Sequence, residues 1–139
     1  MASPISNQCL ILTPPGDEFA PVRNFIAGMV SGGEEYHPLQ PVFKDQTSDW
    51  ERILPLVEKS SLVVVDITGN DPNVMYELGL AHGLKKQVLV LVQKGEGSVP
   101  SDLRGVFFYV YEPDNIAELE TVIRHLVYGF ARDLHSMAR

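Results

Sequence analysis

Five short apolar runs, four of them followed by a segment with helical spacing, constrain the fold more than any other feature of this sequence. The clearest run is "SLVVVDI" (61–67), which is apolar and β-branched on both faces, as expected for a central, fully buried parallel strand. Strands that alternate with helices predict a parallel sheet with helices on both faces and right-handed crossovers. The other runs are "CLILT" (9–13), "LQPVF" (39–43), "QVLVLVQ" (87–93) and "VFFYVY" (106–111).

We therefore expect an α/β fold built on a doubly wound parallel five-stranded sheet. The predicted strand order is flavodoxin-like, 2-1-3-4-5, with run 61–67 beside run 9–13. Pro41 cannot donate a ladder hydrogen bond, so the run 39–43 is predicted at an edge. No internal repeat or low-complexity segment interrupts the alternation, and a length of 139 residues favours a single domain over residues 1–139.

The helices are predicted from their apolar spacing and from their start and stop residues. Ser48 and Glu51 form a capping-box pattern, and Pro55 should kink the helix that follows or shift its start. Asp71 is the expected N-cap of a helix over 72–84, with Pro72 at its first position. Two more helices are expected, from Phe19 to a stop at Gly32–Gly33 and from Ile116 to Phe130.

Charge and composition exclude several classes of function. The net charge of −7 argues against duplex nucleic acid and against an anionic membrane surface as partners. Cys9 is the single cysteine, so no internal disulfide can form, and its apolar surroundings predict an inert buried thiol. The N-terminus lacks a signal-peptide pattern, and no apolar run approaches the ~20 residues of a membrane span. A cytoplasmic protein is expected.

In a doubly wound sheet, ligands bind beyond the carboxyl ends of the strands where the strand order switches. For the predicted order this point lies between the loops Thr13–Glu18 and Thr68–Asn73. The second loop leads into a helix N-terminus, where free N–H groups and the helix dipole favour an anion. The candidate ligand-binding residues are Thr13, Pro14, Gly16, Asp17, Thr68, Gly69, Asn70 and Asn73.

Glu77 stands out within the apolar helix "PNVMYELGLAHGL" (72–84). The core stripe of this helix is expected to include Val74 and Leu78, and Glu77 lies about 60° from it, at the border between core and cleft. A carboxylate held there is partly desolvated, which suits a nucleophile or a group with a shifted pKa. The alternative is a solvated surface glutamate, which is the commoner case for a helix.

Asp66 and Asp71 are further candidate catalytic carboxyls, with structural alternatives. An aspartate at a strand end often accepts hydrogen bonds from loop N–H groups, and Asp71 can be a plain N-cap. His82 has no partner at metal-ligand spacing, so no metal is expected. The sequence contains no GxGxxG, GxxxxGK[ST], HExxH or GxSxG pattern, and no cofactor is expected.

The stretch "VVVDITGNDPNVMYELGLAHGLKKQVLVL" resembles the signature of the nucleoside 2-deoxyribosyltransferase-like superfamily. It is most similar to the small bacterial TIR-like branch, whose signature has a form close to "aDlTg-x-NPNVxYELGxAhaxgK". The segments "LTPPGDEFAPV" and "VPSDLRG…YVY" resemble the family's first loop and helix and its late loop and last strand. The strong match covers about 30 residues, and the weaker matches extend it over most of the chain.

The resemblance implies an enzyme that acts on N-ribosyl bonds. In these transferases and the related nucleotide N-hydrolases, the glutamate of the "YELG" helix attacks the anomeric carbon, and this position is Glu77. A second acid near the base is expected, and Asp71 matches its spacing. The transferases also carry an aspartate in the helix before the third strand, whereas residues 51–58 offer only Glu51 and Glu58. This departure from the pattern puts transferase activity in doubt.

The predicted function is cleavage or transfer at the N-glycosidic bond of a nucleoside, nucleotide or NAD. A carboxylate beside the sugar can stabilise or trap an oxocarbenium-like cation, while Asp71 or Asp66 protonates the departing base. Two alternatives stay open: a nucleotide-binding sensor without turnover, and a TIR-like signalling or assembly domain. Because related enzymes often complete their sites across subunits, a homo-oligomer is expected.

Overall fold

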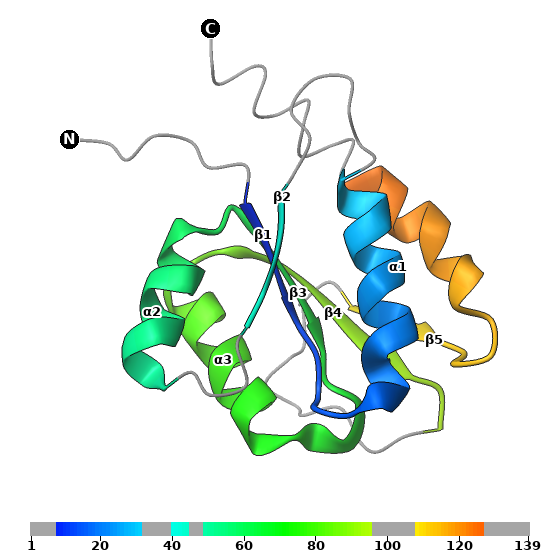
Figure 1. Ribbon diagram of the computed structural model, residues 1–139, viewed down its shortest axis with the longest axis horizontal. Helices are drawn as coiled ribbons and strands as arrows, with labels where there is room; N and C mark the ends of the chain where they lie inside the picture. The colour runs from blue at the N-terminus through cyan, green and yellow to red at the C-terminus, as the bar shows by residue number, and fades with distance from the viewer. Residues whose placement is uncertain (1–7, 32–39, 45–48, 96–107, 127–139) are drawn as a thin grey trace, which may run out of the picture.

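The computed structural model describes residues 8–31, 40–44, 49–95 and 108–126. Within them, five strands form one parallel sheet in the order β2-β1-β3-β4-β5 (Figure 1). The predicted α/β class, the flavodoxin-like order and the place of the third strand beside the first are therefore confirmed. The strands are β1 (Gln8–Leu12), β2 (Gln40–Phe43), β3 (Leu62–Asp66), β4 (Gln87–Gln93) and β5 (Phe108–Tyr111).

The burial of each strand follows its place in the sheet. All five residues of β3 are buried, because β1 and β4 pair with its two edges and helices cover both of its faces. β2 is an edge strand, and there Pro41 stands opposite Cys9 of β1. An edge strand tolerates proline because its outer side needs no ladder hydrogen bond, so the predicted edge position is confirmed.

Helices cover both faces of the sheet, as the sequence predicts (Figure 1). On one face, Val22 and Ile26 of α1 (Ala20–Ser31) and Ile123 of the helical residues 119–126 pack on the inward side chains of β1, β3 and β4. On the other face, Val57 of α2 (Trp50–Lys59) and Leu78 of α3 (Pro72–Gly83) pack on the alternate side chains of the same strands. The described residues also form short 3-10 turns: η1 (Asp17–Phe19), η2 (Thr68–Asn70) and η4 (Ile116–Glu118).

The helix starts agree with the sequence in one case and differ in another. Asp71 caps α3 and Pro72 is its first residue, as predicted. For α2 the N-cap is Asp49, whose side chain accepts a hydrogen bond from the Arg52 N–H, so the helix starts one residue later than the capping-box pattern at Ser48 predicts. Aspartate caps as well as serine does, and it stands one position closer to the helix.

α2 also runs through Pro55 to Lys59, so of the two effects predicted for this proline the shifted start is wrong, and the kink stays a prediction. Several predicted features fall on residues outside the described ranges: Ser48, the stop at Gly32–Gly33, the ends of the runs 39–43 and 106–111, and the helix beyond residue 126. In the described part of the chain, the helices are too short or too polar to cross a bilayer.

Candidate active site

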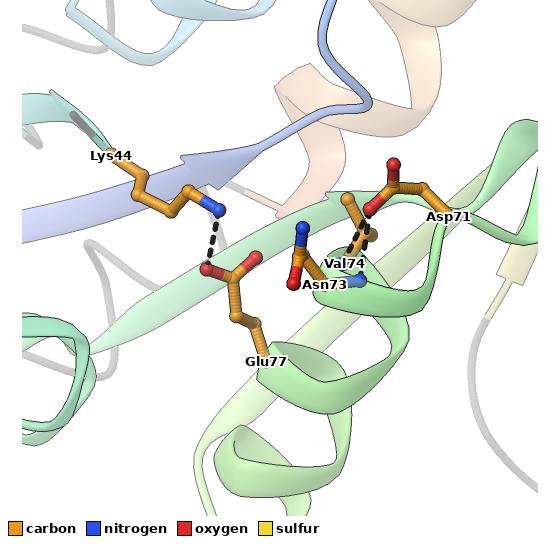
Figure 2. A network of polar contacts seen from close by, with 5 residues as sticks. All are labelled: Lys44, Asp71, Asn73, Val74 and Glu77. Carbon is orange, nitrogen blue, oxygen red and sulfur yellow. Dashed lines mark hydrogen bonds and ion pairs between the residues drawn. The ribbon is translucent and has the colours of Figure 1, made fainter. Parts of the chain in front are cut away.

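α3 carries the candidate carboxylate, and its start is determined by local chemistry. The Asp71 Oδ1 atom accepts hydrogen bonds from the Asn73 N–H at 2.9 Å and the Val74 N–H at 3.1 Å, and Pro72 needs no acceptor at this position. Glu77 follows one turn after Asn73 and is only 3% exposed. It is therefore not a solvated surface residue, and Figure 2 shows its side chain beside the start of the helix.

The partner of Glu77 is Lys44, which directly follows the edge strand β2. The Lys44 Nζ atom lies 2.9 Å from the Glu77 Oε2 atom (Figure 2). The second carboxylate oxygen, Oε1, is buried and accepts no hydrogen bond from the described residues. A buried carboxylate oxygen without a donor is costly, which makes Oε1 the atom with most to gain from a ligand.

Burial raises the pKa of Glu77 above its ordinary value. The hydrogen bond and positive charge of Lys44 act in the opposite direction, and the negative charge of Asp71 adds to the rise. Desolvation outweighs the ion pair here because it penalises the charged form of the whole carboxyl group, whereas Lys44 contacts one of the two oxygens.

Glu77 lies on the wall of a cavity of about 460 Å³ at the carboxyl end of the sheet. Charged groups of both signs face it: Arg23 of α1 and Lys44 on one hand, and Asp71 and Glu77 on the other. The Arg23 Nε–H donates to the Thr13 hydroxyl at 3.1 Å, which joins α1 to the loop after β1. The lining comprises Ile11, Leu12, Thr13, Pro14, Pro15, Arg23, Asn24, Phe43, Lys44, Asp71, Asn73, Val74 and Glu77.

Five of the predicted site residues meet in this cavity, and six do not. The cavity is displaced toward the β2 edge, because residues at the end of β2 form one wall and the tip of the loop after β3 contributes nothing. Thr13, Pro14, Asp71, Asn73 and Glu77 line the cavity. Gly16, Asp17, Asp66, Thr68, Gly69 and Asn70 are not among its lining residues.

Asp66 instead belongs to a buried polar network on the β4–β5 side of the sheet. It is fully buried and accepts hydrogen bonds from the Thr68 N–H and hydroxyl, at 3.0 and 2.6 Å, and from the Tyr111 hydroxyl. The Thr68 hydroxyl in turn accepts from the Gln93 N–H at 2.9 Å. Burial raises the pKa of Asp66, while these hydrogen bonds favour its charged form. This network ties the loop after β3 to β4 and β5.

The turn after β3 explains two more of the predicted residues. Gly69 has a φ of 78° and Asn70 a φ of 55°, backbone conformations that glycine and asparagine tolerate best. Glycine and asparagine therefore both have a structural reason to occupy this tight turn, which brings Asp71 to the start of α3.

A second cavity, of about 330 Å³, lies beside the first and shares Lys44, Asn73 and Glu77 with it. Its remaining lining residues are Asp49, Trp50, Ile53 and Tyr76, from the start of α2 and from α3. No cluster of three or more potential metal-ligating side chains occurs within the described ranges.

Sequence reasoning missed Arg23, Lys44 and the whole second cavity. One signal for Lys44 was present: it stands at the carboxyl end of the strand next to the first one, where ligands of doubly wound sheets bind. Trp50 and Tyr76 carried a weaker signal, as large aromatic residues at positions outside the apolar stripes of their helices.

The fold and the cavity together define an α/β protein of flavodoxin-like topology with a buried carboxylate at the ligand-binding end of its sheet. No protein-family model matches the sequence, and no curated protein matches it. Solved structures do match. One is the CMP N-glycosidase BcmB of Clostridium botulinum, with a TM-score of 0.58 and 10% identity over 81% of this chain and 98% of that chain.

Two other similar structures belong to larger proteins, and this chain matches only a part of each. The translation elongation factor SelB of Methanococcus maripaludis has a TM-score of 0.52 and 10% identity over 86% of this chain and 33% of that chain. The lysine decarboxylase LdcF of Francisella novicida has a TM-score of 0.50 and 12% identity over 88% of this chain and 18% of that chain. At such identities these likenesses show a shared fold.

Proposed function

We propose that this protein cleaves the N-glycosidic bond of a nucleoside or nucleotide and that Glu77 is the catalytic carboxylate. The observation that carries the proposal is the Glu77 carboxyl group, buried on a cavity wall with Oε1 unpartnered. Two further points support it: the resemblance of the "YELG" segment to the 2-deoxyribosyltransferase-like superfamily, and the likeness in fold to a CMP N-glycosidase over nearly all of that chain.

The proposed reaction follows from the charge that develops on the sugar. As the bond from the anomeric carbon to the base nitrogen breaks, its electron pair leaves with the base and the sugar becomes oxocarbenium-like. The Glu77 Oε1 atom stabilises this cation or bonds to the anomeric carbon. Water then delivers its hydroxyl to that carbon, any bond to Oε1 breaks with its electron pair returning to the carboxylate, and the proton of the water balances the released base.

Lys44 has a defined part in this proposal. Burial alone would favour a protonated Glu77, and a protonated carboxyl group cannot stabilise a cation. The ion pair at 2.9 Å counters burial and holds the Oε2 atom, so that Oε1 is the oxygen left for the sugar. Lys44 is thus a positioning residue that helps to keep the carboxylate ionised.

The cations of the larger cavity favour a substrate that carries a phosphate. The Nε–H of Arg23 donates to the Thr13 hydroxyl, and the guanidinium group carries further N–H donors. Guanidinium N–H groups bind phosphate oxygens well. The Asp71 Oδ1 atom serves as the helix cap, which leaves Oδ2 for a sugar hydroxyl or for the base. We assign no step to Asp66, because its carboxyl group is enclosed by Thr68 and Tyr111.

The test is release of free base from a panel of nucleosides, ribo- and deoxyribonucleoside 5′-monophosphates and NAD, measured by chromatography. The wild-type protein should release base from at least one of them, and Glu77→Gln should lower the rate by about 1000-fold or more, as expected for a catalytic side chain. Glu58→Gln, on the exposed side of α2, is the matched control and should keep the rate. Equal release by Glu77→Gln, or no release by the wild type, contradicts the proposal.

A second candidate function is a nucleotide sensor without turnover. The Lys44–Glu77 ion pair favours it, because a carboxylate neutralised by a cation is a weaker nucleophile. A sensor would gain thermal stability from a nucleotide, by RT ln(1 + [L]/Kd), while the nucleotide stays intact. Thermal melts and chromatography on the same samples separate the two functions.

A further inference from the structure

The second cavity carries an unusual pair of side chains. Trp50 is 61% exposed and Tyr76 is 63% exposed, yet both line the same hollow next to Glu77. The aromatic rings come from different helices, Trp50 from the first residue of α2 and Tyr76 from the middle of α3. Large exposed rings that converge on a cavity are a common way to bind a flat ligand.

Glu77 stands where the two cavities meet, since it lines both of them with Lys44 and Asn73. The bond broken in the proposed reaction joins two parts of different chemistry: a sugar, with or without phosphate, and a flat base. A carboxylate that acts at this bond therefore belongs at the junction of a sugar site and a base site. The arrangement of the two cavities matches that requirement.

The lining of each cavity assigns the two parts. The larger cavity has Arg23, which does not line the smaller one, and its guanidinium group suits a sugar phosphate. The smaller cavity has Trp50 and Tyr76, which suit a base, because every base has a face that stacks on aromatic rings. Asp49 adds an acceptor for N–H groups at the edge of a base.

Resting on the function proposed above, we propose that the smaller cavity is the subsite for the departing base, which stacks on Trp50 and Tyr76. These residues then determine base affinity, while the sugar phosphate occupies the larger cavity near Arg23. Stacking on one aromatic side chain alters affinity by roughly 5- to 150-fold. Removing either ring should weaken binding of a complete nucleotide by that factor and leave binding of a sugar phosphate without a base unchanged.

Trp50 makes the test direct, because it is the single tryptophan of the sequence. Trp50 lines the smaller cavity and not the larger one, so its fluorescence reports on the smaller cavity. The common ribonucleoside 5′-monophosphates are titrated into the wild-type protein, with ribose 5-phosphate as the probe that lacks a base. A stacked base should quench the emission of Trp50 at saturation, whereas bound ribose 5-phosphate should leave it unchanged.

Calorimetry on variants completes the test. Trp50→Ala and Tyr76→Ala should each weaken binding of the best monophosphate by roughly 5- to 150-fold, and Trp50→Phe, which keeps a ring, should recover most of the loss. Phe108→Ala is the matched control, since Phe108 is an exposed aromatic residue on β5 that lines neither cavity. All of these positions are exposed, and melting temperatures near that of the wild type verify the fold of each variant.

The outcomes separate this inference from the proposed function. If a monophosphate binds without quenching Trp50 and Trp50→Ala leaves its affinity unchanged, the base lies elsewhere and the inference is wrong, while cleavage that depends on Glu77 still supports the proposed function. Equal weakening of nucleotide and ribose 5-phosphate also overturns it. If stacking is found but no base is ever released, the subsite stands and the proposed catalysis fails. Absence of binding by every monophosphate overturns the inference, while base release from the wider panel still decides the proposed function.

Discussion

Lys44→Met should destabilise the protein through Glu77, in a way that depends on pH. Methionine keeps the length of the apolar stem and removes the charge. At 2.9 Å the gross attraction is about 6 kcal/mol for an effective dielectric constant of about 20. Most of it is offset by the hydration that both groups give up. Measured losses range from about 0–1 kcal/mol for exposed pairs to 3–5 kcal/mol for buried ones.

Lys44 is 22% exposed at its side chain and Glu77 4%, so we expect an intermediate loss of about 2 kcal/mol at neutral pH. For 139 residues the unfolding entropy is about 0.3 kcal/mol per kelvin, which converts this loss to a Tm about 7 °C lower. The pKa of Glu77 in the folded state is already raised and should rise further without Lys44. The loss should therefore be full at pH values above the folded-state pKa of Glu77 in the variant. It should disappear as acid protonates Glu77 in the folded state of both the variant and the wild type.

The assay is urea unfolding of four proteins at neutral and mildly acidic pH: wild type, Lys44→Met, Glu77→Gln and the double variant. In the Glu77→Gln background, Lys44→Met should cost under about 0.5 kcal/mol, because no buried charge is left unpaired. An equal cost in both backgrounds, or a cost that does not change with pH, would refute the reasoning and assign the loss to packing of the lysine stem.

Two further predictions concern buried groups outside the cavity. Tyr111→Phe removes a hydroxyl that donates to Asp66, so it should lower the free energy of unfolding by about 1.5–3 kcal/mol at neutral pH. The loss should shrink as the pH falls through the raised pKa of Asp66. Urea unfolding across that pH range measures the loss, and a loss that does not change with pH would contradict the assigned network. Cys9 is fully buried, and burial raises its pKa to about 12, so a thiol-specific reagent should label it only as fast as the protein opens. Rapid labelling of the folded protein would show that β1 is accessible.

Local patterns in the sequence were enough to predict the fold. The run of β-branched residues in β3 predicted a strand buried on both faces, because parallel sheets are covered on both sides. Pro41 predicted an edge strand, because proline has no N–H to donate to a neighbouring strand. Asp71 and Pro72 determined where α3 starts. From that start, helical geometry alone placed Glu77 at the border between core and cleft, where it is found.

The composition of the site depended on contacts between residues distant in the sequence. Asp66 and Asp71 are similar acids in one loop region, yet Asp66 is enclosed by Tyr111 of β5 while Asp71 lines the cavity. Lys44 pairs with Glu77, and Trp50 lines a cavity together with Tyr76, because the end of β2, the start of α2 and α3 all border that cavity. Backbone preferences and apolar spacing act over a few residues, so the sequence determined each element and the position of Glu77 on its helix. The partners of Glu77 and the two cavities beside it were decided by the packing of helices on the sheet, where side chains from separate segments come within contact distance.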